Sequence, residues 1–375
     1  MSGIYIHIPF CRQKCYYCDF YKTVNTTLTS HFILALKSEV AQRKNYLGDD
    51  KVKTIYFGGG TPSILTPNEL KEILDLLYIE FQISDDVEIT FEANPDDLSS
   101  TYLAEIFNLG INRLSIGIQS FDNELLKLMN RRHNAGQAVE VVENAAKSGF
   151  RNISADLIYG LPGLTTQKWK QSLSTIYKLP VQHLSAYHLT YHKGTPFYTW
   201  VKKGTLKALK ESESVRQFEI LLDSASGNGF EQYEISNFAK NELYSKHNSS
   251  YWKNLKYLGL GPSAHSYNGN LRSWNISHTE GYIKALKSGL SFSEQEILTE
   301  NDKFNEYVLT GIRTKWGISL KEIEDKFGLN KKEYVLKQIK TYNKFNLIRI
   351  ENGIVTLTRK GIFVSDDIMS NLMFI

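Results

Sequence analysis

The only cysteines of the chain, Cys11, Cys15 and Cys18, lie within eight residues near the N-terminus. They are spaced C-x3-C-x2-C and follow a strand-like apolar run at residues 4–8. Three thiols cannot all pair as disulfides, and a structural zinc ion would need a fourth ligand. Three thiolates on one loop do suit a [4Fe-4S] cluster in which one iron has no protein ligand. The spacing therefore predicts a cluster with an iron that is free to bind a further molecule.

Two other interpretations of this cysteine loop stay open. One is a structural zinc ion that takes His7 or His31 as its fourth ligand, and the other is three ordinary thiols. Free cysteines are usually buried and dispersed rather than gathered on a loop beside charged residues, which favours the cluster. Because a cluster and exposed thiolates need a reducing compartment, we expect a cytoplasmic protein. In agreement, we find no signal peptide and no apolar stretch of membrane-spanning length.

The chain alternates between strand-like runs and segments of helical periodicity up to about residue 189. We expect strands at 3–8, 53–57, 87–92, 112–118, 152–158 and 183–189, and helices at 29–47, 67–81, 98–109, 123–149 (interrupted at 131–135) and 165–179. Alternating β and α units predict a parallel sheet with right-handed crossovers. Six units close only part of an eight-stranded barrel, so we predict an α/β fold with a partial (β/α)6 TIM-like barrel.

The polar and glycine residues of interest fall where these strands end. The cysteine loop follows the first strand, residues 58–62 (Gly-Gly-Gly-Thr-Pro) follow the second, and Glu92, Gln119 and Asp156 lie late in the next three. In parallel barrels the active site lies at this edge. The glycines let a ligand approach the backbone and offer N–H donors, although a tight β–α turn explains them equally when they are taken alone. We therefore expect one site along the carboxyl ends of the strands.

Length and composition indicate a globular protein of more than one domain. The chain has 375 residues, 42% apolar and 22% charged, with a net charge of +4. This length exceeds what one hydrophobic core usually supports. We expect a core barrel at 1–235, a connecting segment rich in aromatics and glycine at 236–295, and a small α+β, winged-helix-like domain at 296–375, where Asn352-Gly353 predicts a hairpin. The nearly balanced charge argues against a nucleic-acid partner.

Taken together, these motifs resemble the radical SAM superfamily, and within it the branch of the oxygen-independent coproporphyrinogen III oxidases. The matching segments are residues 5–11, 15–18, 58–62, 92–95, 117–121, 130–133 and 156–162. The resemblance extends over nearly the whole chain. It implies that the open iron of the cluster binds S-adenosylmethionine (SAM) through the amino and carboxylate groups of that molecule.

The resemblance also implies roles for individual residues, although it assigns no catalytic acid or base. It places Cys11, Cys15 and Cys18 on the cluster, Tyr5 beside the SAM, Gly59, Gly60 and Thr61 at its methionyl part, and Glu92, Gln119, Arg131 and Asp156 at its carboxylate or ribose. Carboxylates accept hydrogen bonds from ribose hydroxyls, and arginine pairs with carboxylates. The alternatives are a solvated helix end for Arg131, beside Arg132, and a buried structural acceptor for Asp156.

Three features separate the chain from the oxidases and resemble their sister group, the HemW haem chaperones. The oxidases have a cysteine motif that resembles C-x3-C-x2-C-x-C. In this chain, Phe20 occupies the position of the last cysteine of that motif. The oxidases also have a long segment before the cysteines, whereas ten residues precede Cys11 here. The third feature is the stretch from His247 to Trp252, which matches the HNxxYW pattern of the chaperones.

A histidine suits axial ligation of haem iron, and aromatic side chains suit stacking on the macrocycle. We expect haem at His247, Asn248, Tyr251 and Trp252, and if the segment is helical, His247 and Tyr251 share a face. The alternative is an ordinary aromatic packing cluster, because most lone histidines ligate nothing.

The resemblance therefore implies a haem chaperone that carries a [4Fe-4S] cluster and SAM and delivers haem, its cargo, to an acceptor haemoprotein. Membrane-associated respiratory proteins are candidate acceptors, and a homodimer is compatible with the resemblance. The alternative function is decarboxylation of coproporphyrinogen III to protoporphyrinogen IX, and cleavage of SAM stays open. A metal-dependent regulator that binds DNA through its C-terminal domain is disfavoured by the charge balance.

Overall fold

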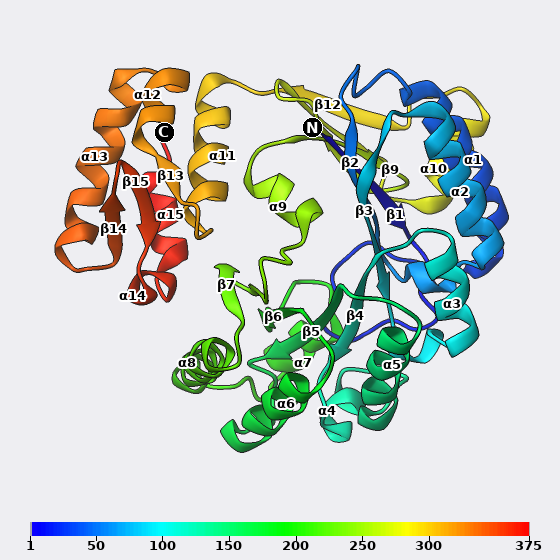
Figure 1. The fold of residues 1–375 in the computed structure, drawn as a ribbon, viewed down its shortest axis with the longest axis horizontal. Coiled ribbons are helices and arrows are strands. Elements are labelled where there is room, and N and C mark those ends of the chain that lie inside the picture. Colours follow the sequence, from blue (N-terminus) through cyan, green and yellow to red (C-terminus); the bar gives the residue numbers. More distant parts are fainter. Residues whose placement is uncertain (1, 375) are drawn as a thin grey trace.

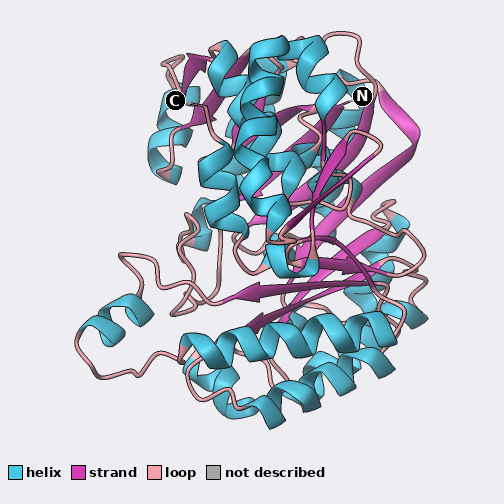
Figure 2. Cartoon of the chain, turned by 90° about the vertical axis from the view of Figure 1, so that its left-hand side faces the viewer, coloured by secondary structure: helices cyan, strands magenta, loops and turns pink. Residues whose placement is uncertain are grey.

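The computed structural model describes residues 2–374, and its main feature is a twelve-stranded sheet (Figures 1 and 2). Six parallel strands form the centre: β1 (Ser2–Ile8), β2 (Val52–Gly59), β3 (Ile83–Ala93), β4 (Arg113–Gln119), β5 (Ile153–Tyr159) and β6 (His183–His188). They are hydrogen-bonded in chain order. The bounds of these strands agree with the predicted bounds to within a few residues. The prediction rested on apolar runs, and these runs are buried on both faces of the sheet. The predicted α/β fold with a large parallel sheet is confirmed.

Helices connect these strands and pack along the outside of the sheet (Figure 2). They are α1 (Thr29–Arg43), α2 (Pro67–Glu80), α3 (Ser100–Asn108), α4 (Asn123–Leu128), α5 (Ala135–Lys147) and α6 (Thr166–Lys178), with single 3-10 turns at Thr26–Leu28, Pro62–Ile64 and Pro95–Asp97. Helix α2 illustrates why they form. Thr66 and Glu69 make a capping box before a buried stripe that includes Leu70 and Leu77. Burying each such leucine contributes about 1.5–3 kcal/mol.

The chain beyond the sixth strand extends this sheet at both edges, and this extension was not expected from the sequence. Its elements are α7 (Pro196–Lys202), α8 (Glu211–Gly227), β7 (Glu231–Glu234), β8 (Asn237–Ala239), α9 (Lys246–Trp252), β9 (Lys256–Leu260), β10 (His265–Tyr267), β11 (Leu271–Asn275), α10 (Thr279–Lys287) and β12 (Ser293–Ile297). Strand β9 runs parallel to β1, with Gly259 opposite Tyr5. Residues 236–295 are therefore part of the main sheet.

A buried carboxylate attaches this extension to the core. Glu39 of α1 has no exposed surface and accepts hydrogen bonds from Gly261 N (2.8 Å), Asn275 Nδ2 (2.6 Å) and the hydroxyl of Tyr282 (2.5 Å). The guanidinium of Arg43 lies 3.4 Å from the carboxylate. Burial raises the pKa of Glu39, and these donors and the Arg43 charge oppose that rise. One side chain thus joins α1 to a loop, a strand and α10.

The C-terminal part has its own sheet and its own buried cluster, which includes Phe304, Ile318, Val355 and Ile368. Its elements are α11 (Glu300–Ile312), β13 (Ile318–Ser319), α12 (Leu320–Phe327), α13 (Leu329–Lys344), β14 (Ile348–Glu351), β15 (Ile354–Leu357), α14 (Arg359–Ile362) and α15 (Ser365–Leu372). The predicted hairpin is present as β14 and β15, joined at Asn352-Gly353, where both residues have positive φ. Helix α9 lies between this part and the central strands (Figure 1).

No helix within residues 2–374 has both the length and the apolar character that a bilayer span requires.

Candidate functional site

The carboxyl ends of the central strands line a cavity of about 500 Å³, which we call the cysteine cavity. It brings together ten of the eleven residues predicted for the cluster and SAM: Cys11, Cys15, Cys18, Gly59, Gly60, Thr61, Glu92, Gln119, Arg131 and Asp156. They come from the loop after β1 and from the ends of β2 to β5, with Arg131 in the turn after α4. Tyr5 lies outside this set and lines a second cavity described below.

The cysteine loop is held in place by contacts to distant segments. Cys11 Sγ lies 3.3 Å from the Thr61 hydroxyl, and the N–H of Tyr16 donates to the carbonyl of Met129 (3.2 Å). Within residues 2–374, no three His, Cys, Asp or Glu side chains converge closely enough to hold a single metal ion. Three thiols that line one cavity suit the three cysteine ligands of a [4Fe-4S] cluster with one open iron.

The two histidines considered as zinc ligands are placed elsewhere. The ring nitrogens of His7 lie 3.1 Å from the Tyr5 hydroxyl and 3.2 Å from the carbonyl of Tyr21, so both already have partners. His31 is exposed on α1. Neither lines the cysteine cavity.

Arg131 is partly buried in the wall of this cavity and is not a solvated helix end. Its guanidinium donates to Asn94 Oδ1 (2.5 Å), to the carbonyl of Gly117 (2.6 Å) and to Cys15 Sγ (3.4 Å). Its Nε is buried without a partner among the described residues. A fixed cation beside a cysteine sulfur stabilises negative charge on the loop and on a bound ligand.

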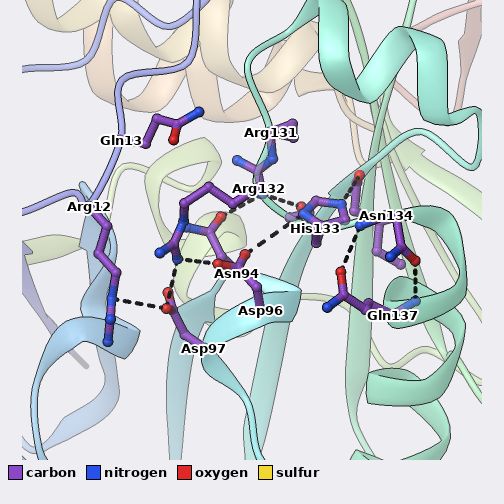
Figure 3. Close-up of polar contacts among 12 residues, drawn as sticks. Arg12, Gln13, Asn94, Asp96, Asp97, Arg131, Arg132, His133, Asn134 and Gln137 are labelled. Carbon is purple, nitrogen blue, oxygen red and sulfur yellow. Dashed lines mark hydrogen bonds and ion pairs between the residues drawn. The ribbon is translucent and has the colours of Figure 1, made fainter.

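The neighbouring Arg132 does not line the cavity and makes ion pairs with two aspartates (Figure 3). It binds Asp96 and Asp97, at 2.9 Å from the latter. Arg12, on the cysteine loop, also lies 3.3 Å from Asp97. This cluster ties the cysteine loop to the segments after β3 and α4, so the two adjacent arginines make different contacts.

The glycine segment is shaped by contacts within the protein. The N–H groups of Gly60 and Thr61 donate to the carbonyls of Ile8 (2.8 Å) and Phe10 (2.7 Å), and that of Gly59 donates to Glu92 Oε2 (3.2 Å). We expected these N–H groups to be donors for a ligand, but in the structure they donate to acceptors within the protein. A Cβ at Gly60 would lie 2.6 Å from the Phe10 carbonyl oxygen, so the turn requires glycine there.

Glu92 ends β3 with a carboxylate in an unusual electrostatic environment. The hydroxyl of Tyr56 donates to it (2.6 Å). Burial raises the pKa of Glu92 to about 7, with the nearby Asp156 charge adding to the rise and the Tyr56 and Gly59 hydrogen bonds opposing it. A carboxyl group poised near neutrality at the end of a barrel strand is typical of functional sites.

Asp156 and Gln119 line the same cavity as Glu92. The hydroxyls of Ser115 (3.1 Å) and Ser154 (3.3 Å) lie within hydrogen-bond distance of the Asp156 carboxylate, whose pKa is raised by burial. This serine cradle fits a structural acceptor, and it also leaves the carboxylate lining the cavity. Gln119 has a φ of 66°, which is a left-handed backbone conformation. It lies where the register between β4 and β5 shifts, and such an irregularity changes the direction of the side chain.

Sequence reasoning missed Arg113, which lines the same cavity. It is 1% exposed, and its Nε and Nη1 have no hydrogen-bond partner among the described residues. Its positive charge acts to lower the pKa values of Glu92, Asp156 and His247. The available signal was an arginine inside an otherwise apolar buried strand, which is the argument that singled out Glu92.

The HNxxYW segment forms α9, and its side chains point in different directions. Asn248 lines the cysteine cavity. Tyr251 and Trp252 line a second cavity of about 610 Å³ on the other side, which we call the aromatic cavity. His247 lies between them, 1% exposed, with Nδ1 2.8 Å from the Thr54 hydroxyl and Nε2 2.8 Å from the Tyr251 hydroxyl. Helix α9 thus lies between two cavities.

The fold and the cysteine-lined edge of the sheet define a radical SAM protein. Residues 5–176 match the model of the Radical SAM superfamily, and residues 298–364 match that of the HemN C-terminal domain. The structure of HemN, the coproporphyrinogen III oxidase of Escherichia coli, has the same fold, with a TM-score of 0.87 at 24% identity over 99% of this chain and 90% of that chain.

Curated proteins resemble the chain over its whole length. The haem chaperone HemW of Bacillus subtilis is 34% identical, with 98% of each chain covered. HemW of Lactococcus lactis is 32% identical over 99% of this chain and 97% of that protein. The mitochondrial radical S-adenosyl methionine domain-containing protein 1 of Bos taurus is 29% identical over 99% of this chain and 87% of that protein. The chain belongs to the HemW family.

Proposed function

We propose that this protein is a haem chaperone that binds haem, a [4Fe-4S] cluster and SAM and transfers the haem to an acceptor haemoprotein. Full-length similarity to the haem chaperones HemW supports the family role. The structural observation that carries the proposal is the placement of α9 between a cysteine-lined and an aromatic cavity. One site suits the cluster and SAM, and the other suits a flat apolar ligand.

Cys11, Cys15 and Cys18 would hold the cluster, and the open iron would bind SAM. When reduced, the cluster supplies the electron that cleaves the C5′–S bond of SAM in this superfamily. In this chain, Gly59, Gly60 and Thr61 would contact the methionyl part of SAM, and Glu92 would accept hydrogen bonds from the ribose hydroxyls. Gln119, Arg131 and Asp156 would meet the carboxylate or the ribose, and the unpaired Arg131 Nε is available for this.

For haem, the geometry favours different roles within the HNxxYW motif. Tyr251 and Trp252 line the aromatic cavity and can contact a macrocycle there. His247 hydrogen-bonds the Tyr251 hydroxyl through Nε2, and it would have to lose one of its two ring hydrogen bonds to ligate iron. Asn248 was expected at the haem and Tyr5 at the SAM, but Asn248 lines the cysteine cavity and Tyr5 lines the aromatic cavity.

The acceptors in this proposal are haemoproteins, among them membrane-associated respiratory ones, and the chaperone acts in the cytoplasm. A homodimer is part of the same proposal. The reducing environment that thiolate ligands need supports the location. Size measurement in solution tests the dimer directly.

The alternative function is oxidation of coproporphyrinogen III, and one reaction separates the two. The chain is reconstituted anaerobically with iron and sulfide and incubated with dithionite, SAM and coproporphyrinogen III, while a parallel sample is titrated with haemin. The proposal predicts saturable haem binding and no protoporphyrinogen IX. Formation of protoporphyrinogen IX and carbon dioxide would contradict it, and would mean that Phe20 in place of a cysteine does not exclude oxidase chemistry.

A further inference from the structure

We propose that haem binds in the aromatic cavity between β9, β10, α9 and α11, and that His265 is its axial ligand. This inference rests on the proposed function, which requires a haem site but does not locate it.

The aromatic cavity has the size and chemistry of a site for a flat apolar ligand. Its volume of about 610 Å³ lies in the range of about 300–1,000 Å³ that is typical of cofactor sites. Seven of its sixteen lining residues are tyrosine, tryptophan or phenylalanine. Tyr251 and Tyr257 meet edge to face at 4.6 Å between ring centroids. Such walls present ring faces and edges against which a porphyrin can stack.

Among the histidines that line this cavity, His265 is the one whose ring is free to ligate iron. His265 begins β10 and is exposed, and no hydrogen bond to its ring nitrogens occurs within residues 2–374. The other histidine of the cavity, His7, has both ring nitrogens near partners. Burial and the nearby Arg272 charge lower the pKa of His265, although Glu296 opposes this, so the ring is neutral at neutral pH as ligation requires.

The position of His247 supports the same assignment. Its ring is enclosed by Tyr5, Tyr56 and Tyr251, and both nitrogens have partners. In this arrangement His247 is a positioning residue that holds the Tyr251 ring against the cavity. A motif histidine can therefore be required for haem binding without touching iron.

Charge complementarity places the haem propionates at Arg272. Arg272, on β11, is the one arginine or lysine among the lining residues. It now pairs with Glu306 of α11 at 2.7 Å, and burial raises the pKa of that glutamate. A propionate can share the guanidinium or replace Glu306, because arginine binds carboxylates in a bidentate manner.

The arrangement suits a ligand that is to be passed on. A single axial histidine on an exposed strand end leaves the other face of the iron open to an acceptor. Phe20, on the cysteine loop, is 67% exposed and lines both cavities. A haem in the aromatic cavity would therefore lie next to the cluster site without being covalently connected to it.

The test is a haemin titration of the full-length chain with reconstituted cluster, followed by difference absorbance and resonance Raman spectroscopy. His265→Ala is expected to lose the spectral signature of histidine ligation and to bind haem about tenfold more weakly or worse. Added imidazole is expected to restore that signature. His31→Ala, an equally exposed histidine outside both cavities, is the matched control and should behave as wild type.

Two further variants separate the cavity from the ligand. Leu309→Trp, which fills the cavity from α11, should weaken haem binding about tenfold or more while leaving the cluster content unchanged. His247→Ala should keep the signature of histidine ligation despite weaker binding. If His265→Ala keeps the wild-type spectrum and affinity, or if His247→Ala loses the ligation signature, the assignment is overturned and the chaperone function stands. If the wild-type chain shows no saturable haem binding, the proposed function fails and this assignment fails with it.

Discussion

The Nδ1 atom of His247 lies 2.8 Å from the hydroxyl oxygen of Thr54, which joins helix α9 to the second strand of the barrel. The backbone N–H of His247 also donates to Glu88 Oε1 of β3 at 3.1 Å. Burial, with the charge of Arg113, lowers the pKa of His247 to about 3, so the ring is neutral at pH 7. The motif histidine therefore fixes α9 on the sheet, and through Tyr251 it fixes one wall of the aromatic cavity.

Replacing His247 by phenylalanine should destabilise the chain, because an aromatic ring stays in place while both ring hydrogen bonds are lost. We expect the free energy of unfolding to fall by about 1–3 kcal/mol, and by about 1 kcal/mol for Thr54→Val, which removes one partner. Urea denaturation of the two variants and their double mutant measures the coupling. An unchanged unfolding midpoint for His247→Phe would contradict this role.

Replacing Cys15 by alanine should abolish the cluster absorbance and leave a folded protein. Cys15 is partly exposed on a loop and does not belong to either hydrophobic cluster. Its sulfur therefore contributes little to packing. Iron and sulfide analysis with circular dichroism checks both results, and Lys14→Ala, an exposed neighbour, is the control. Loss of secondary structure together with the iron would mean that the metal is structural.

Glu92 should make the stability of the ligand-free chain depend on pH. Its pKa rises from 4.5 to about 7 on folding, so its favourable contribution is fully present below about pH 4.5 and is lost as the pH rises to about 7. Glu92→Gln does not titrate. We expect the variant to gain about 1–3 kcal/mol in free energy of unfolding relative to wild type between pH 4.5 and pH 8. Parallel pH profiles for the two chains would show that Glu92 is not the group responsible.

Glu39→Ala should be strongly destabilising, because it leaves Arg43 and three hydrogen-bond donors buried without their acceptor. Removing one member of such a network typically costs about 3–5 kcal/mol. Glu72→Ala removes an exposed carboxylate that pairs with Lys37 and should cost less than about 1 kcal/mol. Denaturant unfolding compares the two. Similar losses for both would refute the view that Glu39 anchors the extension of the sheet.

The first six β–α units could be predicted from the sequence because each carries its signal locally. Helix α2, for example, has its capping box, its proline and its apolar stripe within residues 66–80. The interruption expected at residues 131–135 lies in the turn between α4 and α5. Nine of the ten predicted residues in the cysteine cavity follow from the rule that parallel strands present their functional residues at one edge, whereas Arg131 came only from the resemblance to the radical SAM superfamily.

The extension of the sheet and the aromatic cavity could not be predicted in this way, because their signals are not local. Strand β9 has five residues, and its partner β1 lies about 250 residues earlier in the chain. Glu39 occupies the middle of a helix, and its partners lie on three later segments. The function proposed for His265 depends on side chains of β9, α9 and α11, and tertiary packing alone brings these side chains together.

The measurement that tests the central claim most directly is the stoichiometry of haem binding by the cluster-reconstituted chain, followed by addition of apomyoglobin as a haem acceptor. The account predicts saturable binding of one haem per chain, with a Soret band that moves to that of myoglobin when the acceptor is added. Absence of saturable binding, together with turnover of coproporphyrinogen III in the presence of SAM, would contradict it.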